Sequence, residues 1–179
     1  MPRIYLAGPT VFAKDCDAQF ARLRRLCAAA GAVGLSPLDG ELSDPTLSGA
    51  DLARAIFEHN LELIQEADAM IADARMFRGL EPDSGTMFEI GYAHALGKPI
   101  AVYGVPESSH SERIVQACGV EHIDGRPYDL RYGQLIESLG LPLNLMIACS
   151  AHVAPSAEAA VAHVVARLAA QRPQRLRAA

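Results

Sequence analysis

The 179-residue sequence has no apolar run long enough to cross a bilayer and no excess of basic residues. Lysine and arginine total 16 against 21 aspartates and glutamates, a net charge of -5. This balance argues against nucleic acid or an acidic membrane as the main partner. The first residues run directly into a strand-like segment, so we expect no signal peptide and a cytoplasmic location.

Paired cysteines are also missing. The four cysteines are scattered, with no C-x-x-C pair and no histidine at zinc spacing: Cys16, Cys27, Cys118 and Cys149. We interpret them as reduced thiols of a cytosolic protein and expect no metal site. Hydrophobic residues make up 50% of the chain and charged residues 21%, which is typical of a globular protein with one core.

Apolar runs of strand length alternate with helical segments along the first two thirds of the chain. The expected strands lie at residues 3–9, 32–36, 69–74 and 100–105, and the expected helices at 13–30, 48–66 and 84–96. Alternation of this kind predicts the α/β class, with a doubly wound parallel sheet and right-handed crossovers. We expect a single domain over residues 1–170, followed by a basic, frayed tail at 171–179.

Turn and cap residues predict where several helices begin and end. Ser48 is expected to cap the second helix in a capping box with Asp51. Ser156 is expected to cap a last helix that ends near Ala170. Between them the pattern is weaker, and it favours short helices at 114–117 and 135–140.

The stretch 81–99 has the pattern of a loop, a helix start, a short helix and a stop. Asp83 or Ser84 can cap the helix, and Gly97 ends it. Glu89 lies in this helix, which is apolar on most sides, so its carboxylate has either a special role or a place on the wet side. The helix dipole favours the anion in the first two turns, and an ionised carboxylate in a partly dry site suits a nucleophile.

Ligands of open parallel sheets bind beyond the carboxyl ends of the strands. Four turn-rich or polar segments fall at or just after those ends: residues 5–9, 37–40, 73–83 and Tyr103. They converge on one crevice, and this favours an orientation of Glu89 toward it. Asp83 nevertheless has a simpler interpretation as a helix cap, and Tyr5 one as an inward-facing strand residue.

Together these segments resemble the nucleoside 2-deoxyribosyltransferase family. The matching runs are Tyr5-Leu6-Ala7-Gly8-Pro9, Pro37-Leu38-Asp39-Gly40, Phe77-Arg78-Gly79, the stretch from Asp83 to Pro99, and Asn144-Leu145-Met146. The resemblance implies a flavodoxin-like fold and transfer of a 2-deoxyribosyl group between nucleobases, without metal or cofactor. The implied partners are a small-molecule deoxynucleoside and a free nucleobase.

The resemblance also implies roles for individual residues. Glu89 matches the nucleophile, Asp83 the acidic residue that exchanges a proton with the base, and Tyr5 a tyrosine that orients Glu89. The expected substrate-binding residues are Gly8, Pro9, Asp39, Asn60, Phe77, Arg78, Gly85, Asn144 and Met146. Asn144 and Met146 match residues that a neighbouring subunit supplies, so we expect a homo-oligomer with a shared site. Asn60 departs from the family, because many members carry Asp there and an amide binds a base edge without donating an acid proton.

The expected reaction is a retaining double displacement through a covalent deoxyribosyl-Glu89 intermediate. A first alternative is a 2-deoxynucleoside 5-monophosphate N-glycosidase, in which water replaces the acceptor base and a cationic or Ser-rich pocket holds the phosphate. A second alternative is a non-catalytic nucleotide-binding module, which would bind without turnover. By default Met146 is a core filler, and Arg78 is a solvated loop residue.

Overall fold

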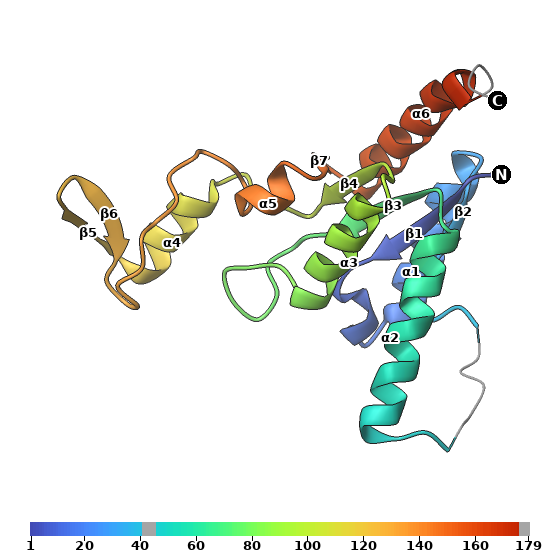
Figure 1. Cartoon of the computed structure of the whole chain (residues 1–179), viewed down its shortest axis with the longest axis horizontal. Coiled ribbons are helices and arrows are strands. Elements are labelled where there is room, and N and C mark those ends of the chain that lie inside the picture. The colour runs from blue at the N-terminus through green and yellow to red at the C-terminus, as the bar shows by residue number, and fades with distance from the viewer. Residues whose placement is uncertain (41–45, 176–179) are drawn as a thin grey trace.

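The computed structural model describes residues 1–40 and 46–175 (Figure 1). Within them, five parallel strands form one sheet in the order β2-β1-β3-β4-β7. The strands are β1 (Arg3–Ala7), β2 (Val33–Leu35), β3 (Ala69–Asp73), β4 (Ile100–Tyr103) and β7 (His152–Val153). This is the flavodoxin-like order, so the expected fold is confirmed. The two-residue strand β7 was not expected, because it is too short to give a sequence signal.

Helices cover both faces of the sheet (Figure 1). One face packs on α1 (Cys16–Ala29) and α6 (Ala157–Arg175), and the other on α2 (Gly49–Glu66) and α3 (Ser84–Ala95). Successive side chains of a strand point to opposite faces, so Ile4 and Leu6 join the first core while Tyr5 joins the second. This alternation places Tyr5 on the face that carries α3. None of the described helices is both long enough and apolar enough to span a membrane.

Three local expectations differ from the structure. Residues 135–140 form no helix, because Leu135 pairs with Tyr128 in an antiparallel bridge and tertiary pairing overrides the local pattern. Ser48 begins α2 without a side-chain cap hydrogen bond, so the expected capping box is absent. The last helix continues beyond Ala170 to Arg175, and residues 176–179 of the expected tail lie outside the described part.

The segment between β4 and β7 projects away from the sheet (Figure 1). It contains α4 (His110–Cys118), the hairpin of β5 (Val120–Ile123) and β6 (Arg126–Asp129), and α5 (Leu145–Ala148). The hairpin was not predicted, and α4 is longer than expected because Ser109 and Glu112 form a capping box at its start. Large apolar side chains stay exposed on this projection, among them Leu130, Tyr132 and Leu139.

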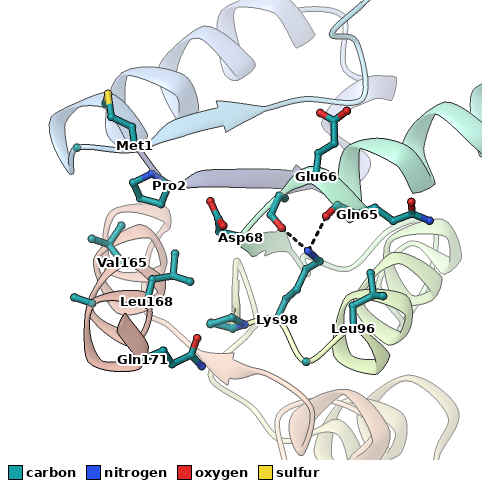
Figure 2. A pocket seen from close by; sticks show the side chains of 15 residues that line it. Met1, Pro2, Gln65, Glu66, Asp68, Leu96, Lys98, Val165, Leu168 and Gln171 are labelled. Carbon is teal, nitrogen blue, oxygen red and sulfur yellow. Dashed lines mark hydrogen bonds between the residues drawn. The ribbon is translucent and has the colours of Figure 1, made fainter. Parts of the chain in front are cut away.

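A cavity of about 540 Å³ lies at the N-terminal edge of the sheet, opposite the ligand-binding edge of such folds (Figure 2). Lys98 reaches into it and donates from Nζ to the carbonyl oxygens of Gln65, at 3.0 Å, and of Ala67. These carbonyls belong to the last turn of α2, where a cation also complements the helix dipole. The run that ends in Lys98 and Pro99 therefore has a structural role.

Replacing Lys98 by methionine is expected to lower the free energy of unfolding by about 1–2 kcal/mol, because the C-terminal carbonyls of α2 lose a charged donor. The measurement is urea unfolding followed by circular dichroism. Lys14 is the matched control, since it is the other lysine of the chain and is exposed. Equal effects of Lys98→Met and Lys14→Met would show that the cap contributes nothing.

Candidate active site

A cleft of about 610 Å³ opens at the carboxyl edge of the sheet. The turn after β1, the loop after β2, helix α2 and the first turns of α3 form its walls. It lies where β1 stands between β2 and β3, which is the switch point of this strand order. The lining residues are Gly8, Val11, Phe12, Pro37, Leu38, Gly40, Ile56, His59, Asn60, Asp83, Gly85, Thr86 and Glu89.

Tyr5 and Glu89 meet beside this cleft although 84 positions separate them in the sequence. The Tyr5 hydroxyl donates a hydrogen bond to Glu89 Oε1 at 2.8 Å. Tyr5 is fully buried, and burial together with the nearby Glu89 charge raises the pKa of its hydroxyl. Tyr5 therefore stays protonated and remains a hydrogen-bond donor to the carboxylate.

Glu89 is half-buried, and its environment disfavours the ionised form of its carboxyl group. Burial is the largest effect and raises the pKa of Glu89 to about 7, the hydrogen bond from Tyr5 lowers it, and the charge of Asp83 raises it. Burial thus disfavours the ionised form that a nucleophile needs, and its effect on the pKa exceeds that of the Tyr5 hydrogen bond. Glu89 therefore titrates near neutral pH while it faces the cleft.

Asp83 is both a helix cap and a lining residue of the cleft. Its Oδ2 accepts hydrogen bonds from the backbone nitrogen of Thr86 at 2.9 Å and from the Thr86 hydroxyl at 3.0 Å. The predicted cap is thus formed. Gly85 also lines the cleft, and a Cβ on it would lie 3.1 Å from Asp83 Oδ2, so the turn leaves little room for a side chain.

Gly8 brings the turn after β1 close to the end of β3. Its φ is +140°, and a Cβ there would lie 2.7 Å from Cβ of Asp73, so only glycine fits. Pro9 follows as the first residue of the short helix η1 (Pro9–Phe12); it is buried and does not line the cleft. Phe12, at the end of η1, lines the cleft with 60% of its side chain exposed.

Phe77 and Arg78 adjoin the cleft through Phe12. The Phe77 ring stacks on the Phe12 ring at a centroid distance of 5.4 Å. The Arg78 guanidinium lies 4.6 Å from the Phe77 centroid and 5.6 Å from that of Phe12. These two predicted substrate residues therefore support an aromatic wall and do not line the cleft themselves. Phe12 was not predicted as a site residue, because η1 is too short to give a periodic pattern in the sequence.

Helix α2 contributes three lining residues, Ile56, His59 and Asn60. Asn60 lines the cleft as expected, and within the described residues its buried Oδ1 has no hydrogen-bond partner. His59 was missed, although its position beside Asn60 in the sequence is a signal that could have revealed it. Asp39 does not line the cleft; its carboxylate accepts from Arg24 and from the backbone nitrogen of Ser36.

Asn144 and Met146 lie on the projection and do not line the cleft of their own chain. Asn144 Oδ1 accepts from the Met146 backbone nitrogen at 3.0 Å and caps α5. The Met146 side chain is 71% exposed, so the core-filler interpretation is wrong.

The chain is similar to proteins of one known family. The sequence model of the nucleoside 2-deoxyribosyltransferase family matches residues 4–146. The chain belongs to this family. A family relative of known structure, a 2-desoxiribosyltransferase from Leishmania mexicana, is 36% identical with a TM-score of 0.71, over 93% of this chain and 98% of that one.

The chain is also similar to two further proteins. A 2-deoxyribosyltransferase from Bacillus psychrosaccharolyticus is 21% identical with a TM-score of 0.56, over 87% of each chain, and shows the fold alone. The uncharacterized protein C191.05c of Schizosaccharomyces pombe is 32% identical over 116 residues, which is 64% of this chain. The aligned part spans 55% of the length of that relative.

Proposed function

We propose that this deoxyribosyltransferase-family chain transfers a 2-deoxyribosyl group between nucleobases through a covalent deoxyribosyl-Glu89 intermediate. The main support is a half-buried carboxyl group that lines the cleft and accepts a hydrogen bond from Tyr5. An aromatic and aliphatic wall of Phe12, Leu38 and Ile56 gives the base an apolar surface. We assign the catalytic domain to residues 1–170.

In the first step a Glu89 oxygen bonds to the anomeric carbon while the bond from that carbon to the base nitrogen breaks. The bonding electron pair leaves with the base, which takes up a proton. A second base then attacks the same carbon, gives up a proton, and releases the Glu89 carboxylate. Two inversions give net retention. A 2-hydroxyl would destabilise the cationic transition state, so deoxy substrates are favoured.

The proposed partners are a deoxynucleoside, a free base and a second copy of the chain. Asn144 and Met146 of one copy would close the sugar pocket of another. The support is that Met146 is 71% exposed on a projecting segment and lies outside its own cleft.

The lining of the cleft argues against the phosphate-bearing alternative. Among its described lining residues there is no lysine or arginine to pair with a 5-phosphate. A hydrolase of nucleoside monophosphates on this site would depend on Arg78, which adjoins the cleft and lies over the Phe77 and Phe12 rings. The non-catalytic alternative leaves unexplained why a carboxyl group is buried beside a tyrosine donor at the cleft.

The decisive experiment is base exchange. The protein is incubated with thymidine and adenine, and the products are separated by chromatography beside a Glu89→Ala control. Deoxyadenosine and thymine from the wild type alone support the proposal. Thymine with free deoxyribose points to the hydrolase, and no product from pyrimidine donors, purine donors or monophosphates points to a binding module.

A further inference from the structure

The titratable side chains that line the cleft, within the described part of the chain, are Glu89, Asp83 and His59. Transfer requires that the leaving base receives a proton and that the incoming base loses one. Glu89 is the proposed nucleophile, so it attacks as a carboxylate and has no proton to give to the base in the same step. Asp83 caps α3 through Oδ2, a contact in which the carboxylate acts as a hydrogen-bond acceptor. His59 is the remaining group.

We propose that His59 exchanges the proton with the nucleobase in the transfer reaction. This inference rests on the proposed function and deepens it. When Glu89 bonds to the anomeric carbon, the electron pair of the breaking bond passes to the base. His59 gives its Nδ1 proton to a nitrogen or carbonyl oxygen of that base and becomes neutral. The incoming base returns a proton to Nδ1 when it attacks.

The hydrogen bond of His59 defines which nitrogen takes part. Nε2 lies 2.5 Å from the backbone oxygen of Asp39, and a carbonyl oxygen only accepts, so Nε2 carries a hydrogen. The neutral ring therefore has its lone pair on Nδ1, and protonation adds the second hydrogen there. A ring held in this way presents one nitrogen for proton exchange.

The anchor of the ring is itself held in place. The carboxylate of Asp39 accepts from Arg24, from the Ser36 backbone nitrogen at 2.8 Å and from the Ser36 hydroxyl at 3.2 Å. Gly40 lies against the ring, and a Cβ on Gly40 would lie 3.2 Å from Cε1 of His59. The loop after β2 thus fixes the imidazole on the cleft wall.

Asn60 supplies a complementary neutral group at the adjoining position. Its side chain is an amide whose buried Oδ1 has no hydrogen-bond partner among the described residues. The amide can orient a base N–H but cannot donate an acid proton. Of these two neighbours on α2, only His59 can supply a proton to the base.

The test measures cleavage of deoxyuridines whose 5-substituents make the leaving base progressively more acidic: 5-methyl, hydrogen, 5-fluoro and 5-nitro. A base that leaves readily as an anion needs no acid. We expect His59→Asn to lower kcat/KM for thymidine by about 10²–10³-fold and to affect the 5-nitro donor far less. If His59→Asn folds poorly, His59→Gln replaces it, since its amide can still donate to the Asp39 carbonyl. We expect His59→Gln likewise to lose much more kcat/KM with thymidine than with the 5-nitro donor.

Two variants serve as controls. His94→Asn changes an exposed histidine of α3 outside the cleft and should leave every donor unchanged. Asp83→Asn keeps a good cap residue and removes the carboxyl group. The proposal is overturned if kcat/KM of both His59 variants falls by the same factor with all donors, or does not fall at all. It is also overturned if only Asp83→Asn loses more kcat/KM with thymidine than with the 5-nitro donor. A wild type that transfers no deoxyribosyl group from any pyrimidine or purine donor removes the proposed function and this inference with it.

Discussion

Replacing Glu89 by glutamine is expected to lower kcat/KM for base exchange by at least about 10³-fold, because the amide has the shape of the carboxylate but cannot form the glycosyl ester. Product chromatography at donor concentrations well below KM measures the effect. Glu62→Gln is the matched control, since it changes an exposed glutamate of α2 outside the cleft. Exchange at near wild-type rate in Glu89→Gln would contradict the role of Glu89.

The same variant has a predictable effect on stability. The pKa of Glu89 rises from 4.5 to about 7 on folding, so between these values the folded chain binds more protons than the unfolded chain. The free energy of unfolding therefore falls as the pH rises through this range, and the destabilisation by the ionised Glu89 is fully present above pH 7. Glu89→Gln should unfold at a temperature equal to or above that of the wild type at pH 8. A large fall in melting temperature would mean that the activity loss reflects misfolding.

The pH dependence of the wild type is the second large effect. Only the ionised Glu89 attacks, so kcat/KM should fall about tenfold per pH unit below the pKa of about 7. Tyr5→Phe removes the donor that lowers this pKa, and its acid limb should move to higher pH. The measurement is the initial rate of exchange from pH 5 to pH 9. A wild-type rate that stays flat down to pH 5, or a Tyr5→Phe limb at lower pH, would be inconsistent with a buried nucleophile held by Tyr5.

The parallel sheet was accessible from the sequence for physical reasons, whereas the pairing of Tyr5 with Glu89 was implied only by the family resemblance. Strand and helix periods alternate clearly through residue 103, and they specify a parallel sheet. Polar residues after the strands had to gather at one edge of that sheet. The structure then shows that Tyr5 lies on the face of β1 that packs on α3.

Other parts of the site could not be predicted because they depend on tertiary placement. The rotation of α2 about its axis decides that His59 and Ile56 line the cleft. Phe12 depends on a turn that only the close approach of Gly8 to Asp73 allows. The hairpin of the projection has little buried apolar surface, so its strands carry a weak pattern.

Asp83 and Lys98 show that one motif can combine structural and functional residues. Both belong to the stretch that carries the family resemblance. Lys98 caps the end of α2 at the edge of the sheet away from the cleft. Asp83 caps the start of α3 and lines the cleft. Both residues belong to the same sequence motif, so only their positions in the folded structure distinguish the structural role from the functional one.

The central claim is that Glu89 carries the deoxyribosyl group between the two bases. The most direct test is rapid acid quenching of the protein with a deoxynucleoside and no acceptor base, followed by intact mass measurement and peptide mapping. The account predicts a mass increase of one deoxyribosyl group on the peptide that contains Glu89, which disappears when a free base is added. Protein that stays unmodified during active exchange, or a modified residue other than Glu89, would contradict it.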